Sequence, residues 1–366
     1  KSSNQATWRI FFLLPAGLSL LTALNAGLLL LGVEAPVNNW SDIHGVLMVV
    51  GFLGTLIAME RSVALRHPLG YLAPALLGVG GILLLTPAPQ ELAQLLFIEG
   101  AIAFVVVYIL LWRRSQDVVV AIQLLGAIHL LIATFLWLTT PIPQILPWFI
   151  GFLLLTITAE RVELARLYMP RNVDRVLVLA ATSFTLAVTL SLWWPDLAAR
   201  LGGVIMVAFT IWLIAYDVAR TFIKTQGLPR FSAAALLGGY FWLTVASIIW
   251  LASGLPQEGY IYDGAVHAVM LGFAMSMIMA HAPIILPAVL RRPLPYRGIM
   301  WIPLALLHLG LVVRVFLGDL PANDAAWKTG GVVNVLAVLA FVLVAVTSSL
   351  TAQRSSLKPT KERSNQ

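Results

Sequence analysis

Two histidines lie just inside apolar segments that are far apart in this sequence. His44 lies about two residues inside one segment, and His267 lies about four residues inside another, some 220 residues later. Ionisable side chains are costly within a bilayer and are usually kept there for function. Two neutral imidazoles at one depth, on separate helices, are the ligands that a haem takes on its two faces. This spacing predicts a haem between His44 and His267, near the outer face of a membrane.

Arg314 adds a cation at a similar depth. It lies about four residues inside the outer end of a third apolar segment, where a guanidinium can pair with a buried haem propionate. The alternative is that the two histidines only hydrogen-bond at a wet interface. In that case Arg314 simply extends its side chain towards water.

His281 is a candidate ligand for a second metal. It follows His267 by fourteen residues, so on a helix it shares the same face about 21 Å further along the axis. Histidine with thioether sulfur suits Cu(I), although methionines are also common core filler. Four methionines precede it: Met270, Met275, Met277 and Met279.

Four other polar residues in or at the ends of the spans have more than one interpretation each. His129 and His308 lie near mid-membrane. They could be ligands of a second metal, members of a proton relay, or histidines satisfied by backbone carbonyls. Glu60 and Glu160 each precede an arginine at the inner end of a segment. They are either interfacial anchors or an inward-facing carboxylate pair for proton or cation passage.

Membrane-spanning helices must position these residues. The 366 residues are 60% hydrophobic and 11% charged, and their mean hydropathy is +0.92. Repeated apolar runs of about 20 residues predict an all-α, polytopic helix bundle. The twelve expected spans are 9–31, 42–63, 71–87, 92–112, 118–139, 145–165, 174–194, 199–222, 232–253, 263–289, 299–318 and 328–350. They form one domain over 1–350, and a basic, disordered tail is expected over 351–366.

The distribution of charge predicts the orientation. The loops between twelve spans lie alternately on the two faces of the membrane. Twenty Lys and Arg residues then fall on one face, and only Arg200 and Lys328 fall on the other. By the positive-inside rule both termini are cytoplasmic, in a bacterial inner membrane. The net charge of +7 therefore reflects topology and contact with the lipid bilayer, and no nucleic acid is expected as a partner. The first apolar run is too long for a signal-peptide core and is expected to be retained as a span.

Cysteine is absent, which excludes disulfides, thiolate-ligated metals and iron–sulfur centres. No phosphate-binding loop, dinucleotide fingerprint or zinc-protease motif is found. The sequence leaves open whether the protein is an enzyme. An oxidoreductase is the class that the histidines suggest.

A weak repeat spaced by 100 residues links three spans. GFLGTLIAMER (51–61) and GFLLLTITAER (151–161) share Gly, Phe, Leu, Ile, Glu and Arg at the same offsets. GFAMSMIMAH (272–281) places His281 at the offset of Glu60 and Glu160. Because these are spans two, six and ten, the pattern suggests three four-helix units, as in cytochrome oxidase subunit I.

The chain resembles the NnrS family, twelve-span haem- and copper-containing membrane proteins associated with nitric oxide stress. The likeness is carried by WRIFFLLPAGLSLL (8–21), WSDIHGVLMVVGFLGTLIA (40–58), LLGGYFWLTVASIIWLAS (236–253), DGAVHAVMLGFAMSMIMAHAPIILPAVLRRPLPY (263–296) and HLGLVVRVF (308–316). It implies haem at His44 and His267 and leaves the copper ligands open. After His267 the family's glycine-rich run is replaced by VMLGFAMSM, so the chain is expected to be a divergent member or a sister family. The adjacent histidine pair of an oxygen-reducing copper centre is absent.

These observations predict a membrane protein with haem b near the outer face and copper as a second candidate cofactor. It would act in the response to nitric oxide, or pass electrons from quinol or an outer-side donor. Two histidine ligands favour electron transfer, because they leave no open iron position for nitric oxide. The alternatives are a metal-free secondary transporter or a non-catalytic subunit of a respiratory complex.

Overall fold

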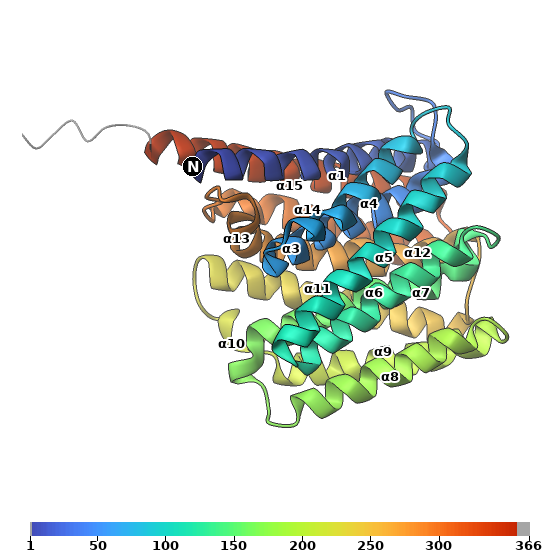
Figure 1. The fold of residues 1–366 in the computed structure, drawn as a ribbon. Coiled ribbons are helices and arrows are strands. Elements are labelled where there is room, and N and C mark those ends of the chain that lie inside the picture. The colour runs from blue at the N-terminus through green and yellow to red at the C-terminus, as the bar shows by residue number, and fades with distance from the viewer. Residues whose placement is uncertain (1, 357–366) are drawn as a thin grey trace, which may run out of the picture.

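The computed structural model describes residues 2–356 of the protein, and they form an all-helical bundle (Figure 1). No strand occurs in this range. Its α-helices are α1 (Ser2–Leu30), α2 (His44–Val46), α3 (Thr55–Leu65), α4 (Leu72–Leu83), α5 (Gln90–Ser115), α6 (Val118–Leu136), α7 (Ile142–Ala165), α8 (Val173–Leu190), α9 (Pro195–Tyr216), α10 (Ala219–Phe222), α11 (Leu228–Ser253), α12 (Gly259–His267), α13 (Ser276–Leu290), α14 (Trp301–Leu311) and α15 (Asp324–Ser356).

Short helical segments of other types connect or extend these α-helices. Four are 3₁₀ turns: η1 (Ser41–Ile43), η3 (Pro68–Tyr71), η4 (Arg166–Tyr168) and η6 (Gly298–Met300). Three are π-helical: η2 (Leu47–Gly54), η5 (Ala268–Met275) and η7 (Val312–Asp319). Backbone polar groups have no water partner in a bilayer, so continuous helices of this kind satisfy them internally.

Eleven helices within the described residues are long and apolar enough to cross a membrane, which confirms the polytopic bundle. The third expected span, 71–87, is the exception: its helix is shorter than predicted and covers Pro68–Leu83. Pro68 starts it, and the turns after Leu83 end it before the loop that leads to α5. This short helix still returns the chain between α3 and α5, so the alternation of spans is kept.

Two other predicted boundaries differ. Span 199–222 ends at Tyr216, because the chain leaves the helix at Asp217 and a separate turn, α10, follows. The last helix continues to Ser356, so the first six residues of the predicted disordered tail are helical. Residues 357–366 of that tail lie outside the described part of the chain.

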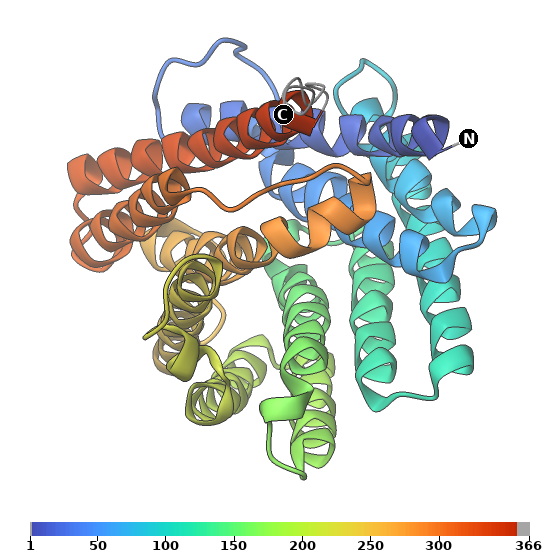
Figure 2. The same ribbon diagram turned by 90° about the vertical axis from the view of Figure 1, so that its left-hand side faces the viewer.

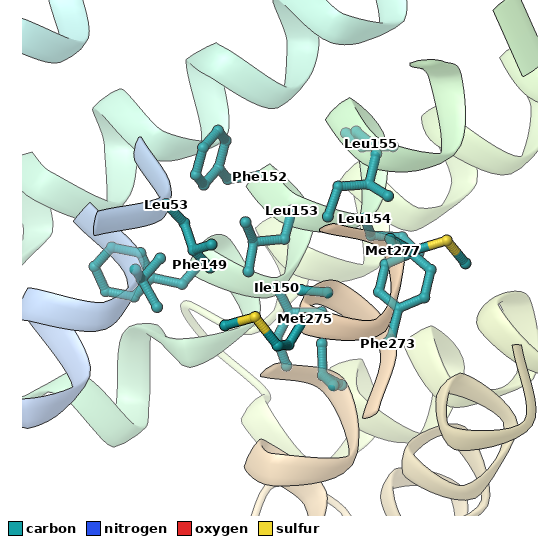
Figure 3. Packing of buried hydrophobic residues seen from close by; sticks show 14 of the residues in the cluster. Leu53, Phe149, Ile150, Phe152, Leu153, Leu154, Leu155, Phe273, Met275 and Met277 are labelled. Atoms are coloured by element: carbon teal, nitrogen blue, oxygen red, sulfur yellow. The ribbon is translucent and has the colours of Figure 1, made fainter. Parts of the chain in front are cut away.

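Three helices occupy the centre of the bundle. Of the eleven long helices, the most buried are Ser41–Leu65 (61% of its apolar window), Ile142–Tyr168 (83%) and Gly259–Leu290 (72%), against at most 56% for the others. These are spans two, six and ten, whose sequences share the repeat. Their apolar side chains interlock in the core, where Leu53, residues 149–155 and Phe273 lie together (Figure 3). The remaining helices surround them in chain order, from blue through green and yellow to red (Figure 2).

The two ends of the described chain lie at the same end of the bundle (Figure 1). Basic residues gather there, because α3, α5 and α13 all finish at that end beside Arg66, Arg114 and Arg291. The opposite end carries the short loop that leads into His44 and the loop that precedes α12. The structure therefore divides the bundle into a basic end, called the inner end here, and an outer end.

Candidate functional site

His44 and His267 meet near the outer end of the bundle. His44 is the first residue of α2, and His267 is the last residue of α12. Their ring centroids are 6.4 Å apart, and the ring planes differ by 29°. The structure thus brings together the two histidines that the sequence paired across some 220 residues.

Each imidazole is held by a backbone carbonyl through its Nδ1 atom. His44 Nδ1 lies 2.7 Å from the carbonyl oxygen of Ala23 in α1, and His267 Nδ1 lies 2.9 Å from that of Asp263, one turn earlier in α12. A carbonyl only accepts, so both Nδ1 atoms carry the proton and both Nε2 atoms keep a free lone pair. This is the tautomer that an imidazole needs to bind a metal through Nε2.

The spacing of the two rings fits one metal atom between them. A metal–imidazole bond is about 2.0 Å, and a ring centre lies about 1.1 Å beyond the nitrogen, so two axial imidazoles have centres about 6.2 Å apart. The observed 6.4 Å agrees with this value. Both rings line one cavity of about 350 Å³, which extends to Met48, Met270 and Trp327. The residues present therefore fit a haem with two axial histidines.

Gly27 of α1 provides the clearance for the His44 ring. A β-carbon at this position would lie 3.1 Å from His44 Cε1 and 3.5 Å from Nδ1. The first distance is shorter than ordinary van der Waals contact. Only glycine at position 27 lets the ring reach the Ala23 carbonyl without displacement.

Arg314 lies at this cavity, as the sequence predicted, but it already has a protein partner. Its Nε and Nη2 atoms each donate to a carboxylate oxygen of Asp263 at 2.8 Å. Trp327 Nε1 donates to the same carboxylate at 3.1 Å, and His267 Nδ1 lies 3.3 Å from its other oxygen. Arg314 is only 6% exposed, so this bidentate pair is shielded from water. A propionate would share Arg314 with Asp263 rather than hold it alone.

Asp263 is the residue that reasoning from the sequence missed. It was not among the predicted site residues, yet its carbonyl orients His267 and its side chain orients Arg314. The available signal was its position four residues before His267, which places both on one helical face.

A second cluster lies towards the inner end. Arg61 Nη2 contacts Glu60 at 2.6 Å and Glu160 at 3.7 Å, while Nη1 lies 3.8 Å from Glu163. Glu60, Glu160 and His281, which share one offset in the sequence repeat, line a single cavity of about 340 Å³. The repeat thus brings one polar residue from each central helix to the same place.

The equivalent arginine of the second repeat has a different partner. Arg161 does not pair with Glu160; its Nε donates to Asp217 at 2.6 Å, and Tyr240 donates to Asp217 at 2.7 Å. Burial alone would raise the pKa of Asp217, but the hydrogen bonds and charge of Arg161 outweigh it and hold that pKa below its usual range. Asp217 follows the end of α9 and binds Arg161 of α7 and Tyr240 of α11. We interpret these three residues as structural.

His129 and His308 do not join either cavity. His129 Nδ1 lies 2.9 Å from the carbonyl of Leu125 in its own helix. His308 Nδ1 accepts from Trp242 at 3.0 Å, so its proton lies on Nε2, which is 3.3 Å from Ser276 Oγ. His308 therefore has no lone pair left for a metal. His308 is thus satisfied by side chains within the core, whereas Nε2 of His129 is buried without a hydrogen-bond partner among the described residues.

The expected copper ligands do not converge. Within the described residues, no group of three or more His, Asp or Glu could hold a metal ion. Met275 and Met277 line the same cavity as His281, but their thioethers point away from each other (Figure 3). Copper binding at His281 stays a prediction, because no set of ligands converges with His281 within the described residues.

Comparison with known proteins gives a family without a described activity. A family profile described as a domain of unknown function (DUF8744) matches residues 9–350, which is nearly the whole chain. No curated protein matches the sequence.

Proposed function

We propose that this chain, which belongs to the DUF8744 family, is an integral membrane protein that binds haem b between His44 and His267 and carries electrons. The observation that supports the proposal most directly is the pair of imidazoles 6.4 Å apart with both Nδ1 protons engaged by carbonyls. A haem bound there would supply a one-electron iron couple. The resemblance to the NnrS family adds the expectation of a role in nitric oxide stress.

The protein's own residues prepare the site. The Ala23 and Asp263 carbonyls fix the orientation of the two rings before any ligand arrives, which reduces the entropy lost on binding. Arg314 and Asp263 place a neutral ion pair beside His267, so the iron would be near a fixed dipole rather than a free charge. His44 and His267 would both hold the iron, so nitric oxide would bind only if one of them left.

The proposed location is a bacterial inner membrane with the basic end of the bundle in the cytoplasm. Arginines gather at the end of the bundle that holds both ends of the described chain (Figure 1), and this supports the orientation through the positive-inside rule. It places the histidine pair near the outer face, within reach of an outer-side electron partner.

The visible spectrum of the purified protein, oxidised and reduced with dithionite, tests the proposal. We expect a sharp reduced α-band that is lost in His44→Ala and in His267→Ala. His129→Ala is the matched control, since it removes a buried histidine from another part of the core and should keep the band. A folded, colourless wild-type protein without metal would refute haem binding and favour a metal-free transporter or a non-catalytic subunit.

A further inference from the structure

The cavity near the inner end, called the inner cavity here, is almost entirely apolar. Its walls come from α1, α3, α7, α13 and α15 and include Leu20, Phe52, Leu53 and Phe341. Val346 of α15 lies at its edge and is 51% exposed on the outer surface of the helices, where lipid would lie. An apolar molecule can therefore pass between the bilayer and this cavity without entering water.

The polar side chains of the inner cavity are Glu60, Glu160 and His281. His281 is 7% exposed, and its Nε2 is buried without a hydrogen-bond partner among the described residues. A buried polar atom that lacks a partner costs free energy, and a bound molecule could remove that cost. The apolar wall and the unpaired nitrogen together point to a ligand with an apolar body and a small polar head.

The charges of the inner cavity identify the kind of head. Arg61, beside Glu60 and Glu160 of this cavity, already contacts Glu60, Glu160 and Glu163, and Arg161 is paired with Asp217. Three carboxyl groups around one guanidinium leave no free positive charge for a phosphate or a fatty-acid carboxylate. A neutral head with hydroxyl or carbonyl oxygens matches the site, because His281 and the carboxyl groups can exchange hydrogen bonds and protons with it.

The inner cavity lies directly below the histidine cavity. The two are about one helical turn apart on each of three helices, where Leu20, Phe52 and Met275 line the inner cavity and Leu24, Met48 and Leu271 line the outer one. Glu60 also borders an open cleft of about 1330 Å³ at the basic end, which includes Arg66 and Arg114. The carboxyl group of Glu60 thus lies between the inner cavity and the aqueous inner face, where it can pass on a proton released in the cavity.

We infer that the inner cavity binds a lipid-soluble quinone or hydroquinone, with its ring head at His281, Glu60 and Glu160 and its isoprenoid tail towards Val346. Oxidation of a hydroquinone to the quinone releases two protons and two electrons. His281 and the two carboxyl groups take the protons. The electrons would pass one at a time to an outer-side one-electron acceptor by way of a haem held by His44 and His267. This step rests on the proposed function, whereas binding of the quinone does not.

Binding of a short-chain ubiquinone analogue to the full chain in lipid nanodiscs tests this inference, with tryptophan fluorescence quenching as the readout. His281→Leu should weaken binding about tenfold, the effect of one lost hydrogen bond to a buried polar head. His281→Gln should recover part of the affinity. Gly17→Phe should abolish binding, because Gly17 lines the cavity and a side chain there meets open space. His129→Leu, which removes a buried histidine elsewhere, should bind like the wild type.

Several results would overturn the inference. Equal affinity in the wild type, His281→Leu and Gly17→Phe would place the quinone elsewhere. Displacement of the analogue by an anionic phospholipid, but not by longer quinones, would assign the cavity to a lipid. The haem-free His44→Ala/His267→Ala variant should still bind the analogue. A failure of haem binding is therefore separable from a failure of quinone binding.

Discussion

Gly27→Ala is the smallest change that should disturb the proposed haem site without removing a ligand. The new β-carbon would lie 3.1 Å from His44 Cε1, whereas ordinary contacts begin at 3.4 Å. The ring must therefore move by about 0.3 Å, which exceeds the tolerance of about 0.2 Å for a metal–ligand bond. The move also strains the 2.7 Å contact of Nδ1 with the Ala23 carbonyl.

Loss of such an orienting contact typically weakens metal binding 10- to 100-fold, or by about 1.4–2.8 kcal/mol. We expect this loss when haem is titrated into haem-free Gly27→Ala protein and the α-band is followed. Gly17→Ala in the same helix is the matched control, because its β-carbon meets nothing within 4 Å. If the two variants bound haem with equal affinity, the proposed placement of haem against His44 would be wrong.

Three further predictions concern the ion pair beside His267 and two buried polar groups elsewhere in the core. Arg314→Gln should lower the haem midpoint potential and Asp263→Asn should raise it, each by tens of mV (about 59 mV per tenfold for one electron), because a positive and a negative charge are removed beside the site. Shifts of the same sign in a redox titration would contradict this. His308→Leu should leave metal content unchanged while lowering the free energy of unfolding by about 1–3 kcal/mol, since Trp242 Nε1 loses its acceptor. Asp217→Asn should cost about 3–5 kcal/mol at neutral pH by leaving a buried guanidinium unpaired.

The pH dependence of the last effect has a definite sign. The folded-state pKa of Asp217 is lowered, so its stabilising contribution is complete above the unfolded value near 4. The contribution is lost as the pH falls through the lowered folded-state pKa. Wild type and Asp217→Asn should therefore differ in thermal stability at pH 7 and converge in strong acid. A constant difference across that range would contradict the assignment.

The sequence was sufficient to predict the bundle, because each span carries its own hydropathy signal and needs no partner to be recognised. The pairing of His44 with His267 followed from their equal depth. The partners of their Nδ1 atoms did not, since the Ala23 carbonyl belongs to another helix and every residue carries a carbonyl. Backbone acceptors have no sequence signature, so the tautomers required the structure.

Other contacts that the sequence did not predict have similar physical origins. Glu160 and Arg161 are adjacent in the sequence, yet their side chains diverge around the helix and meet different neighbours. The pairing of Arg314 with Asp263 was also not predicted, because it joins two helices through residues 51 positions apart in the sequence. The π-helical segments η2, η5 and η7 were also unforeseen, and each lies next to or contains His44, His267 or Arg314. Such wide turns are frequent at functional sites, but local composition does not predict them.

The stacking of the two cavities would make the proposed electron transfer sensitive to membrane voltage. His267 and His281 are fourteen residues apart, about 20 Å along the helix, which is about two thirds of the hydrocarbon thickness. One elementary charge that moves between the cavities would exchange about 1.5 kcal/mol with each 100 mV of potential. With the basic end inside, as proposed, an inside-negative potential would drive an electron outward from the inner cavity to the histidine pair. A cell that loses its potential would therefore slow this transfer even though every residue of both sites is intact.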